Sequence, residues 1–287
     1  MTLLDTLVQG VLLGGLYALF AAGLSLVFGI MRLVNLAHGD LIVMAAYLIL
    51  GVTSALGLNP FAAVLIAAPV MFAAGWLLQT YVLNRVLGED ILPPLLVTFG
   101  LSVVIQNGLL QGFSADSRKL AAGAIEAQSL ALGPISVGVM PLLTLISAVV
   151  VIFALNRLFY RTALGRAFRA TSDDAVTAQL MGIRPQSVFA IATGIAMVVA
   201  TIAALYLGVR SNFDPSIGPA RLLYAFEAVI IGGLGSLWGT LAGGIVIGVA
   251  QALGAVVNPE WQILSGHVAF VAVLLLRPRG LFPRAND

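Results

Sequence analysis

The side chains of this chain that could take part in chemistry are few, and two small groups of them interrupt otherwise apolar sequence. Asn35, His38 and Asp40 form one group, and Glu227 begins the second interrupted stretch. Ionisable groups inside a membrane are costly and usually functional, so these residues could shape or gate a polar path. The alternative for His38 and Asp40 is a place at the cytoplasmic interface, where they satisfy backbone groups freed at the break. The alternatives for Glu227 are a helix cap or a pair with Arg221.

Several other kinds of chemistry are excluded by the residue inventory. The chain has no cysteine, which removes disulfides, thiolate metal sites and cysteine nucleophiles. His38 and His267 lack the spacing of a metal-binding pair, and we expect His267 to be a structural hydrogen-bond partner. The one lysine, Lys119, does not follow a glycine-rich loop, so a P-loop for ATP cannot exist. No nucleophile–base or metal pair is recognisable, and we expect neither an enzyme nor a metal site.

The elements that must position these residues are membrane helices. Hydrophobic residues make up 60% of the chain and charged residues 9%, whereas a soluble domain carries about 25% charged residues. Every long uncharged run reaches the roughly 20 residues that cross a bilayer; the runs are 6–31, 41–84, 91–115, 127–156, 185–209 and 228–259. The pI of about 9.2 reflects basic residues in short loops and does not indicate nucleic-acid binding.

This pattern predicts an all-α polytopic membrane protein with one transmembrane domain over residues 1–287 and eight or nine transmembrane segments. The N-terminus lacks a basic region, which indicates a retained first span and not a signal peptide. The run 228–259 is too long for one helix and is broken by I-I-G-G-L-G-S-L-W-G-T. The expected segments are 3–30, 41–57, 61–83, 91–113, 135–156, 187–209, a half-helix near 222–234, 237–257 and 261–276.

Residues 157–186 are the main charged stretch of the chain. The stretch holds seven of its 26 charged residues, namely Arg157, Arg161, Arg166, Arg169, Asp173, Asp174 and Arg184. When it is placed in the cytoplasm, ten basic residues lie on that side and four on the other. This bias satisfies the positive-inside rule and predicts an outside N-terminus and a cytoplasmic C-terminus. This orientation also requires the run 228–259 to form two segments, because a single crossing there would put the arginines of the C-terminal end outside.

One short helix with clear end signals is expected inside this stretch. Ser172 can cap its N-terminus, and Asp173 and Asp174 would then lie in the first turn, where the helix dipole favours negative charge. Gly182 suits the left-handed position after the helix, and Pro185 prevents its continuation. A loop that only reverses the chain needs no such helix. We therefore predict a docking surface for another protein.

Three blocks of this sequence resemble the LivH-type permease subunits of branched-chain amino acid ABC importers. The blocks are F-G-I-M-R-L-V-N-L-A-H-G-D-L-I-V-M-A-A-Y, L-G-R-A-F-R-A-T-S-D-D-A-V-T-A-Q-L-M-G-I and F-E-A-V-I-I-G-G-L-G-S-L-W-G-T-L-A-G-G. Their order and spacing match that family over essentially the whole chain, and the ending R-P-R-G-L-F-P is similar too. The resemblance implies a permease in the bacterial inner membrane.

The resemblance also implies partners. These are a second permease (LivM-like, or a second copy), two cytoplasmic ATPase subunits that bind the ATP, a periplasmic substrate-binding protein and the lipid bilayer. The coupling helix that docks on an ATPase would involve Gly165, Arg166, Ala167, Arg169, Asp173, Asp174, Ala178, Leu180, Met181 and Gly182. The translocation path would involve Asn35, His38, Gly39, Asp40, Glu227, Gly232, Gly233 and Gly235. No cofactor is expected in this chain.

Other features leave alternatives open. Related permeases carry urea, short amides or aromatic acids, and the sequence does not discriminate between these substrates. A competing function is a secondary transporter that works alone on an ion gradient, with Asp40 or Glu227 as the coupling site. Glycine ridges predict close packing within the fold or between permeases; they contain Gly10, Gly14, Gly15 and Gly23, and Gly235, Gly239, Gly243, Gly244 and Gly248.

Three further expectations concern polar residues on one span, two tryptophans and a possible internal repeat. Gln106 and Asn107 are candidates for lining the path, and Trp238 and Trp261 are candidates for interfacial anchors. Gly39-Asp40-Leu41 and Gly235-Ser236-Leu237 align loosely at an offset of 196 residues. This alignment suggests two related halves, as in transporters whose interrupted helices line the substrate path.

Overall fold

The helices occupy the ranges that apolar runs and end signals predict. The computed structural model describes residues 3–88, 90–132 and 135–282. The helices in the described residues are α1 (Leu3–Met31), α2 (His38–Leu56), α3 (Pro60–Tyr81), α4 (Leu92–Phe113), α5 (Val139–Arg161), α6 (Ala163–Asp173), α7 (Ala175–Leu180), α8 (Pro185–Arg210), α9 (Gly218–Gly232), α10 (Leu237–Val257) and α11 (Trp261–Leu276). Seven of them are long and apolar enough to cross a membrane, and α11 is a shorter apolar helix. The prediction of an all-α polytopic membrane protein is confirmed.

A few boundaries differ from the prediction. Residues 135–138 belong to a short antiparallel hairpin, β1 (Ser129–Leu132) and β2 (Ile135–Gly138), so α5 begins four residues later than expected. Single 3-10 turns occupy Leu83–Arg85 and Gly123–Glu126. Helix α2 begins at His38 and α9 at Gly218, each earlier than expected. The chain therefore places His38, Gly39 and Asp40 inside a helix and not in a loop.

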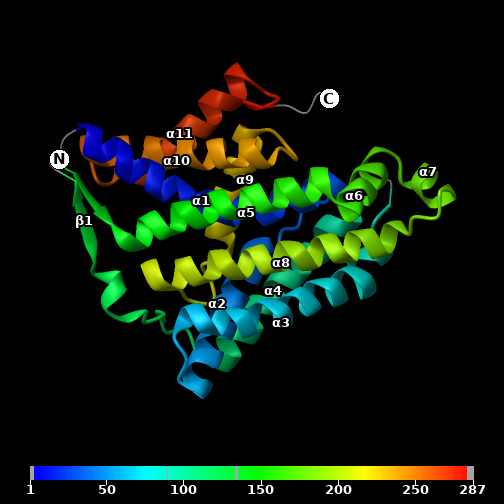
Figure 1. The fold of residues 1–287 in the computed structure, drawn as a ribbon, viewed down its shortest axis with the longest axis horizontal. Helices are drawn as coiled ribbons and strands as arrows, with labels where there is room; N and C mark the ends of the chain where they lie inside the picture. The colour runs from blue at the N-terminus through cyan, green and yellow to red at the C-terminus, as the bar shows by residue number, and fades with distance from the viewer. Residues whose placement is uncertain (1–2, 89, 133–134, 283–287) are drawn as a thin grey trace.

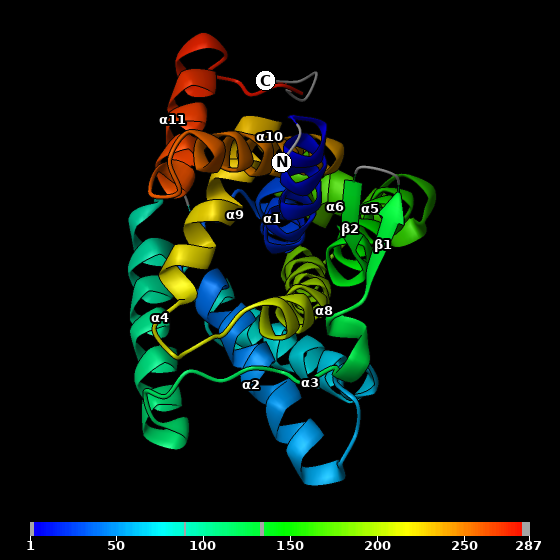
Figure 2. The ribbon, with the colours of Figure 1, turned by 90° about the vertical axis from the view of Figure 1, so that its left-hand side faces the viewer.

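Helix α1 lies at the centre of the bundle, with α5, α8, α9 and α10 around it (Figure 2). Residues 18–22 of α1 have no exposed surface at all. A helix that is apolar all round can be covered in this way because it has no polar face to keep in water. The predicted first span is thus the core helix, and the outer helices are positioned by their contacts with it.

The glycine ridges are contacts within this chain. A Cβ on Gly14 would lie 2.5 Å from the Ile245 Cα, and one on Gly248 would lie 2.3 Å from the Gly10 carbonyl oxygen. In the same way Gly243 faces the Ala228 carbonyl. Backbone therefore touches backbone where α1 crosses α10 and where α9 meets α10. Between the two alternatives for these ridges, the structure selects packing within the fold.

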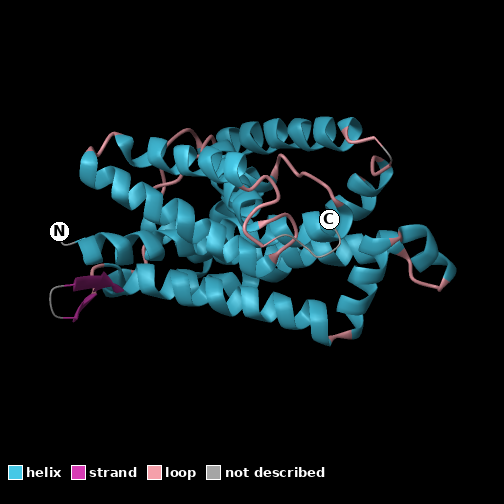
Figure 3. Cartoon of the chain, turned by 90° about the horizontal axis from the view of Figure 1, so that it is seen from above, coloured by secondary structure: helices cyan, strands magenta, loops and turns pink. Residues whose placement is uncertain are grey.

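The two ends of the bundle differ in character. Helices α6 and α7 project at one end, which is named the α6 end (Figures 1 and 3). The N-terminal end of α1 lies at the other, next to the β1–β2 hairpin. Helices α1, α3, α5 and α8 run between these two ends, whereas α2 and α4 are strongly tilted against them (Figures 1 and 2).

The crossing of α1 and α10 yields a stability prediction. The substitution Gly248→Leu should lower the unfolding temperature of the purified chain in detergent, at a cost of more than about 3 kcal/mol, because backbone atoms cannot rotate away from the new side chain as core side chains do. Gly108→Leu on α4 is the matched control, since no atom lies within 4 Å of a Cβ there. Equal unfolding temperatures for the two variants would show that the crossing is not close.

Candidate functional site

The break between α1 and α2 is closed by its own side chains. Arg32 adopts a left-handed backbone conformation with φ 51°. Asn35 is 3% exposed, and its Oδ1 accepts a hydrogen bond from the Ala37 N–H at 3.0 Å. Its carbonyl accepts a further bond from the His38 N–H at 3.2 Å. Asn35 therefore holds the turn that leads into α2.

His38 fastens the start of α2 to the middle of α1. It is 1% exposed, and its Nε2 lies 2.9 Å from the Phe20 carbonyl oxygen. Because a carbonyl only accepts hydrogen bonds, Nε2 carries the proton in this contact. Phe20 lies 11 residues before the end of α1 at Met31, which corresponds to about 17 Å along a helix. The start of α2 therefore packs beside the middle of α1, inside the bundle, and the place of His38 and Asp40 relative to the membrane interface stays a prediction.

Asp40 joins three helices. Its Oδ2 accepts a hydrogen bond from Ser102 Oγ on α4 at 2.5 Å, and Gln106 Nε2 donates to the same Ser102 oxygen at 3.1 Å. A Cβ on Gly218 of α9 would lie 2.0 Å from Asp40 Oδ1, so only glycine fits there. Oδ1 has no hydrogen-bond partner among the described residues. The carboxylate thus has one paired and one open oxygen where α2, α4 and α9 meet.

The two candidate path residues on α4, Gln106 and Asn107, have different surroundings. Gln106 belongs to the Asp40 cluster through Ser102. Asn107 is exposed and donates to the Val103 carbonyl of its own helix at 2.8 Å. Ser102, which the sequence analysis did not single out, is the direct partner of Asp40. Its position four residues before Gln106 places both on one face of α4.

Glu227 lies in the middle of α9 and pairs with α11. It is 3% exposed, and its Oε1 lies 2.5 Å from His267 Nδ1. As the tenth residue of α9 it cannot cap that helix, and its partner is His267 and not Arg221. Both of those alternatives were wrong, whereas the prediction that His267 is a hydrogen-bond partner is confirmed. Oε2 has no partner within the described part of the chain.

An aromatic stack adjoins this pair. The Tyr224 ring stacks on Tyr17 at 4.7 Å between centroids and on the His267 ring at 6.0 Å. The Tyr17 hydroxyl donates to Gln251 Oε1 at 2.6 Å. The stack therefore links α1, α9 and α11 around Glu227. The sequence held no local signal for it, because its members are brought together only by the packing of separate helices.

The second break, between α9 and α10, lies near the α6 end. Helix α9 ends at Gly232, and Gly233 and Gly235 have φ of 100° and 78°. A Cβ on Gly29, close to the end of α1, would lie 3.2 Å from the Gly235 Cα. The candidate path residues therefore occupy two depths, one beside the middle of α1 and one beside its end. The two segments that align in the sequence, 39–41 and 235–237, lie at the starts of α2 and α10. A relation between two halves of the chain stays a prediction.

The ends of the helices at this break are satisfied in two ways. Ser236 caps α10, since its Oγ accepts from the Gly239 N–H at 3.2 Å. The last carbonyls of α9 accept from residues 277–282, which are named the tail segment. Leu281 N–H donates to Ile231 at 2.8 Å and Phe282 N–H to Gly232 at 3.1 Å. The tail segment thus completes the α9 end.

The docking stretch forms two short helices: the predicted helix is present as α7, a second helix, α6, precedes it, and the predicted Ser172 cap was wrong. Thr162 caps α6 by accepting from the Gly165 N–H at 3.0 Å. Ser172 lies inside α6 and donates to the Gly29 carbonyl at 2.8 Å. Asp174 alone caps α7, accepting from the Val176 N–H at 2.9 Å, while Asp173 ends α6. Ser172, Asp173 and Asp174 can each cap a helix. Because the Ser172 hydroxyl is bound to the Gly29 carbonyl, the cap of α7 falls to Asp174.

Other features of this stretch agree with the prediction. Gly182 has φ 84°, as expected of a residue that ends a helix in the left-handed region. Pro185 opens α8, a first-turn position that its missing N–H permits. The hydrogen bond from the Thr177 hydroxyl, followed by those from backbone N–H groups, holds the pKa of Asp174 below its usual range. The cap is therefore charged at neutral pH.

Helix α6 is anchored, and α7 is presented to solvent. Gly165 packs against α5, since a Cβ there would lie 2.2 Å from the Leu158 carbonyl oxygen. Arg169 donates to the Phe159 carbonyl and lies over the Tyr160 ring at 5.4 Å. Of the other candidate coupling residues, Ala178 is buried and Ala167 is half-buried, while Arg166, Asp173, Leu180 and Met181 are exposed.

The exposed face of α7 is apolar. Leu180 is 83% exposed, Met181 79% and Val176 70%. Val176 was missed by the sequence analysis because one apolar residue in a polar loop carries no periodic signal. Three large apolar side chains at a projecting tip are unusual for a free surface.

Comparison with known proteins gives one consistent result. Residues 6–276 match the protein family described as branched-chain amino acid transport system / permease component. The chain is 30% identical to the high-affinity branched-chain amino acid transport system permease protein BraD of Pseudomonas aeruginosa, over 98% of this chain and 96% of that protein. It is 29% identical to LivH of Escherichia coli, described in the same words, over the same shares. A solved structure, PsaBC from Streptococcus pneumoniae in complex with Fab, aligns with 94% of this chain at 14% identity and a TM-score of 0.49.

The Asp40 cluster generates a prediction. Ser102→Ala should lower the stability of the chain in detergent by about 1–3 kcal/mol, because a buried carboxylate loses its hydrogen-bond partner. Ser54→Ala is the control, because Ser54 lies on the exposed part of α2 and its hydroxyl makes no hydrogen bond to any described residue. Thermal unfolding followed by circular dichroism measures both. Unchanged stability of the Ser102 variant would show that the contact does not hold α4 to α2.

Proposed function

Because this chain belongs to the family of branched-chain amino acid transport system permease components, we propose that it forms a membrane path of an ABC importer in the bacterial inner membrane. The match over residues 6–276 carries this proposal. The relatives are permeases of transport systems, which favours an importer subunit over a transporter that works alone on an ion gradient. ATP would bind to partner subunits, and the chain would carry out no covalent chemistry.

The docking site that we propose for an ATPase is the apolar face of α7, formed by Val176, Leu180 and Met181. Three side chains exposed by 70% or more would each contribute about 1.5–3 kcal/mol if a partner buried them. Cap signals on α6 and α7 keep this face in a fixed position. The α6 end would then face the cytoplasm, and the N-terminal end of α1 would face a periplasmic substrate-binding protein. This orientation also satisfies the positive-inside rule.

The coupling that we propose runs from α6 into the membrane through backbone contacts. Ser172 of α6 binds the Gly29 carbonyl of α1, and Gly29 lies against Gly235 in the α9–α10 break. Arg169 binds the Phe159 carbonyl of α5. A displacement of α6 by the ATPase would therefore reach the end of α1 and the break. Alternating access would follow from that movement.

The path that we propose lies along the flank formed by α2, α4, α9 and α11. Figure 2 shows α4, α9 and α11 on the side of the bundle away from α5. Asp40 and Glu227 lie within these helices, and each has one carboxylate oxygen without a partner among the described residues. Buried polar atoms are almost always paired, so these open oxygens support contact with a cation in another state. The ammonium group of an amino acid would supply it.

The remaining parts of the proposal concern composition and selectivity. A second permease, LivM-like or a second copy of this chain, would cover the flank that carries the path. Choice among branched-chain amino acids and other small solutes would rest largely with the binding protein, since Asp40 and Glu227 recognise an ammonium group and not a side chain. The other path candidates, Asn35 and His38, would hold the α2 start in place.

The function is tested by uptake into vesicles. Reconstituted with its ATPase and permease partners, a binding protein and ATP, the chain should support accumulation of radiolabelled leucine. The chain alone, with a proton or sodium gradient and no ATP, should show none, because it has no P-loop and no motor. Gradient-driven uptake by the chain alone would contradict the importer and establish the alternative.

The docking site is tested by a double substitution. Leu180→Ser with Met181→Ser should weaken co-purification of the ATPase at least about tenfold, because two apolar contacts of at least 1.4 kcal/mol together are lost. Leu3→Ser with Leu4→Ser is the matched control, since these residues are exposed by 69% and 56% at the opposite end. Undiminished co-purification of the first variant would place the ATPase elsewhere.

A further inference from the structure

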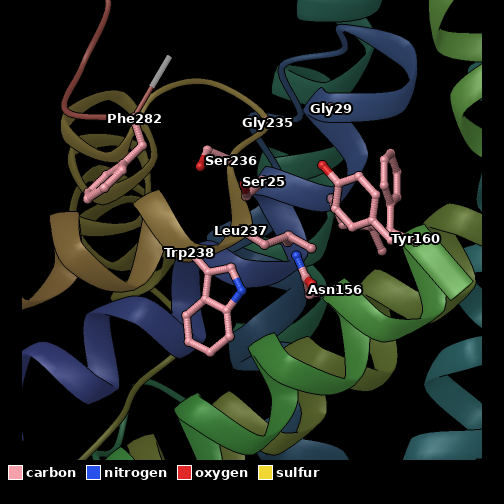
Figure 4. A pocket seen from close by; sticks show the side chains of 11 residues that line it. Ser25, Gly29, Asn156, Tyr160, Gly235, Ser236, Leu237, Trp238 and Phe282 are labelled. Carbon is pink, nitrogen blue, oxygen red and sulfur yellow. The ribbon is translucent and has the colours of Figure 1, made fainter. Parts of the chain in front are cut away.

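A cavity of about 300 Å³ lies between α1, α5 and the start of α10, on the α6 side of the bundle. Figure 4 shows Asn156 and Tyr160 of α5 across the cavity from Ser236 and Trp238, with Ser25 of α1 between them. The Phe282 side chain of the tail segment closes one edge. This space is separate from the Asp40 and Glu227 clusters, because none of its lining residues belongs to either.

The floor of the cavity offers hydrogen-bond donors. The Asn156 side chain makes no hydrogen bond to any described residue, so its Nδ2–H groups are available. The first N–H groups of α10, at Leu237 and Trp238, have no acceptor in their own helix and carry partial positive charge. Ser25 is 1% exposed and lies 2.9 Å from Thr240 Oγ1, which fixes the hydroxyl-lined wall. The arrangement suits oxygen atoms that accept several hydrogen bonds at once.

The surroundings favour an anion over a zwitterion. No Asp or Glu among the described residues lines the cavity, so an ammonium group would find no carboxylate there. Arg157 and Arg161 follow Asn156 and Tyr160 directly and form the neighbouring stripe of α5. Both arginines are exposed, and neither makes an ion pair with any residue that the structure describes. A transported amino acid is therefore a poor occupant.

The rim of the cavity fits a bilayer interface. Tyr160 is 55% exposed, Trp238 43% and Phe282 53%, and amphipathic aromatic rings gather where headgroups meet hydrocarbon. From this rim the exposed surface of α5 continues through Phe153 and Val150 toward the other end, and both are more than half exposed. Cations thus lie beside the cavity on the exposed side of α5, donors lie inside it, and an apolar strip leads away from it.

From this order of groups we propose that the cavity binds the headgroup of an anionic phospholipid from the leaflet on the α6 side. The phosphate accepts from Asn156 and from the first N–H groups of α10, with Arg157 and Arg161 beside it. The acyl chains lie along Phe153 and Val150, since the cavity itself is at the small end of the roughly 300–1,000 Å³ of ligand pockets. Basic pockets of this kind between transmembrane helices bind anionic headgroups.

The experiment uses Trp238 as the reporter. Trp76→Phe with Trp261→Phe leaves Trp238 as the one tryptophan of the full chain, which is then reconstituted in vesicles that contain brominated phosphatidylglycerol or brominated phosphatidylcholine. Bromine on an acyl chain quenches a nearby tryptophan without direct contact, so a lipid whose headgroup occupies the cavity reports at Trp238. Quenching of Trp238 should show a preference for phosphatidylglycerol of roughly fivefold or more, as two nearby cations give.

A matched protein reports the ordinary lipid surface. Trp238→Phe with Trp261→Phe leaves Trp76, which lies on α3 and is 38% exposed, and its preference should be near one. Adding Arg157→Gln and Arg161→Gln to the Trp238 protein should bring the preference down to the Trp76 value. Circular dichroism shows that each variant keeps its helices.

Three outcomes would overturn the proposal. Equal preferences at Trp238 and Trp76 would mean that the cavity does not select a headgroup. Recovery of Trp238 fluorescence on addition of millimolar inorganic phosphate would identify a site for free anions. Absence of quenching by either lipid would mean that protein, such as a second permease, covers the cavity.

Discussion

Helices that stop and start inside this bundle must have their freed backbone groups satisfied by the protein itself, because hydrocarbon offers no hydrogen bonds. The chain meets this constraint at both breaks with its own atoms. Asn35 closes the turn before α2 with its side-chain oxygen. Ser236 caps α10, and the tail segment donates to Ile231 and Gly232 at the end of α9. These contacts satisfy part of the freed backbone groups at each break, while the first N–H groups of α10, at Leu237 and Trp238, line the cavity beside the break.

The same constraint explains why glycine is required at particular contacts. Where α2 and α9 begin, Gly39 and Gly218 bring two backbones together beside the Asp40 carboxylate. Where α1 crosses α10, Gly14 and Gly248 bring the two backbones together, and no polar side chain is involved. The first contact positions the Asp40 carboxylate, and the second fixes the core helix on which that position depends. A side chain at either would separate helices, and with them the groups that the helices hold.

Particular elements show how far the sequence predicts this structure. The bounds of α10 and α11 were predicted to the residue, because their apolar runs end at Asn258-Pro259-Glu260 and at Arg277. His38 lies at the helix break that its polarity indicated, whereas Glu227, expected to begin its segment, lies in the middle of α9. Their partners were not predicted: Phe20 and His267 are 18 and 40 residues away, and the contacts arise from helix packing that no local pattern encodes. The cap of α7 was missed for a related reason, since Ser172 is used by Gly29 of α1.

The two buried carboxylates differ in a way that bears on transport. Glu227 is paired with a ring nitrogen of His267, whereas Asp40 is held by a hydroxyl that shares its oxygen with an amide. Neutral donors stabilise a buried carboxylate less than a cation does. On the proposed path, an ammonium group would therefore add a charged partner to Asp40, whose second oxygen has no partner among the described residues. Because Asp40 lies beside Gly218 at the start of α9, any movement of α9 that follows α6 would change the space at that oxygen, and the proposed path would in this way be linked to the proposed docking site at α7.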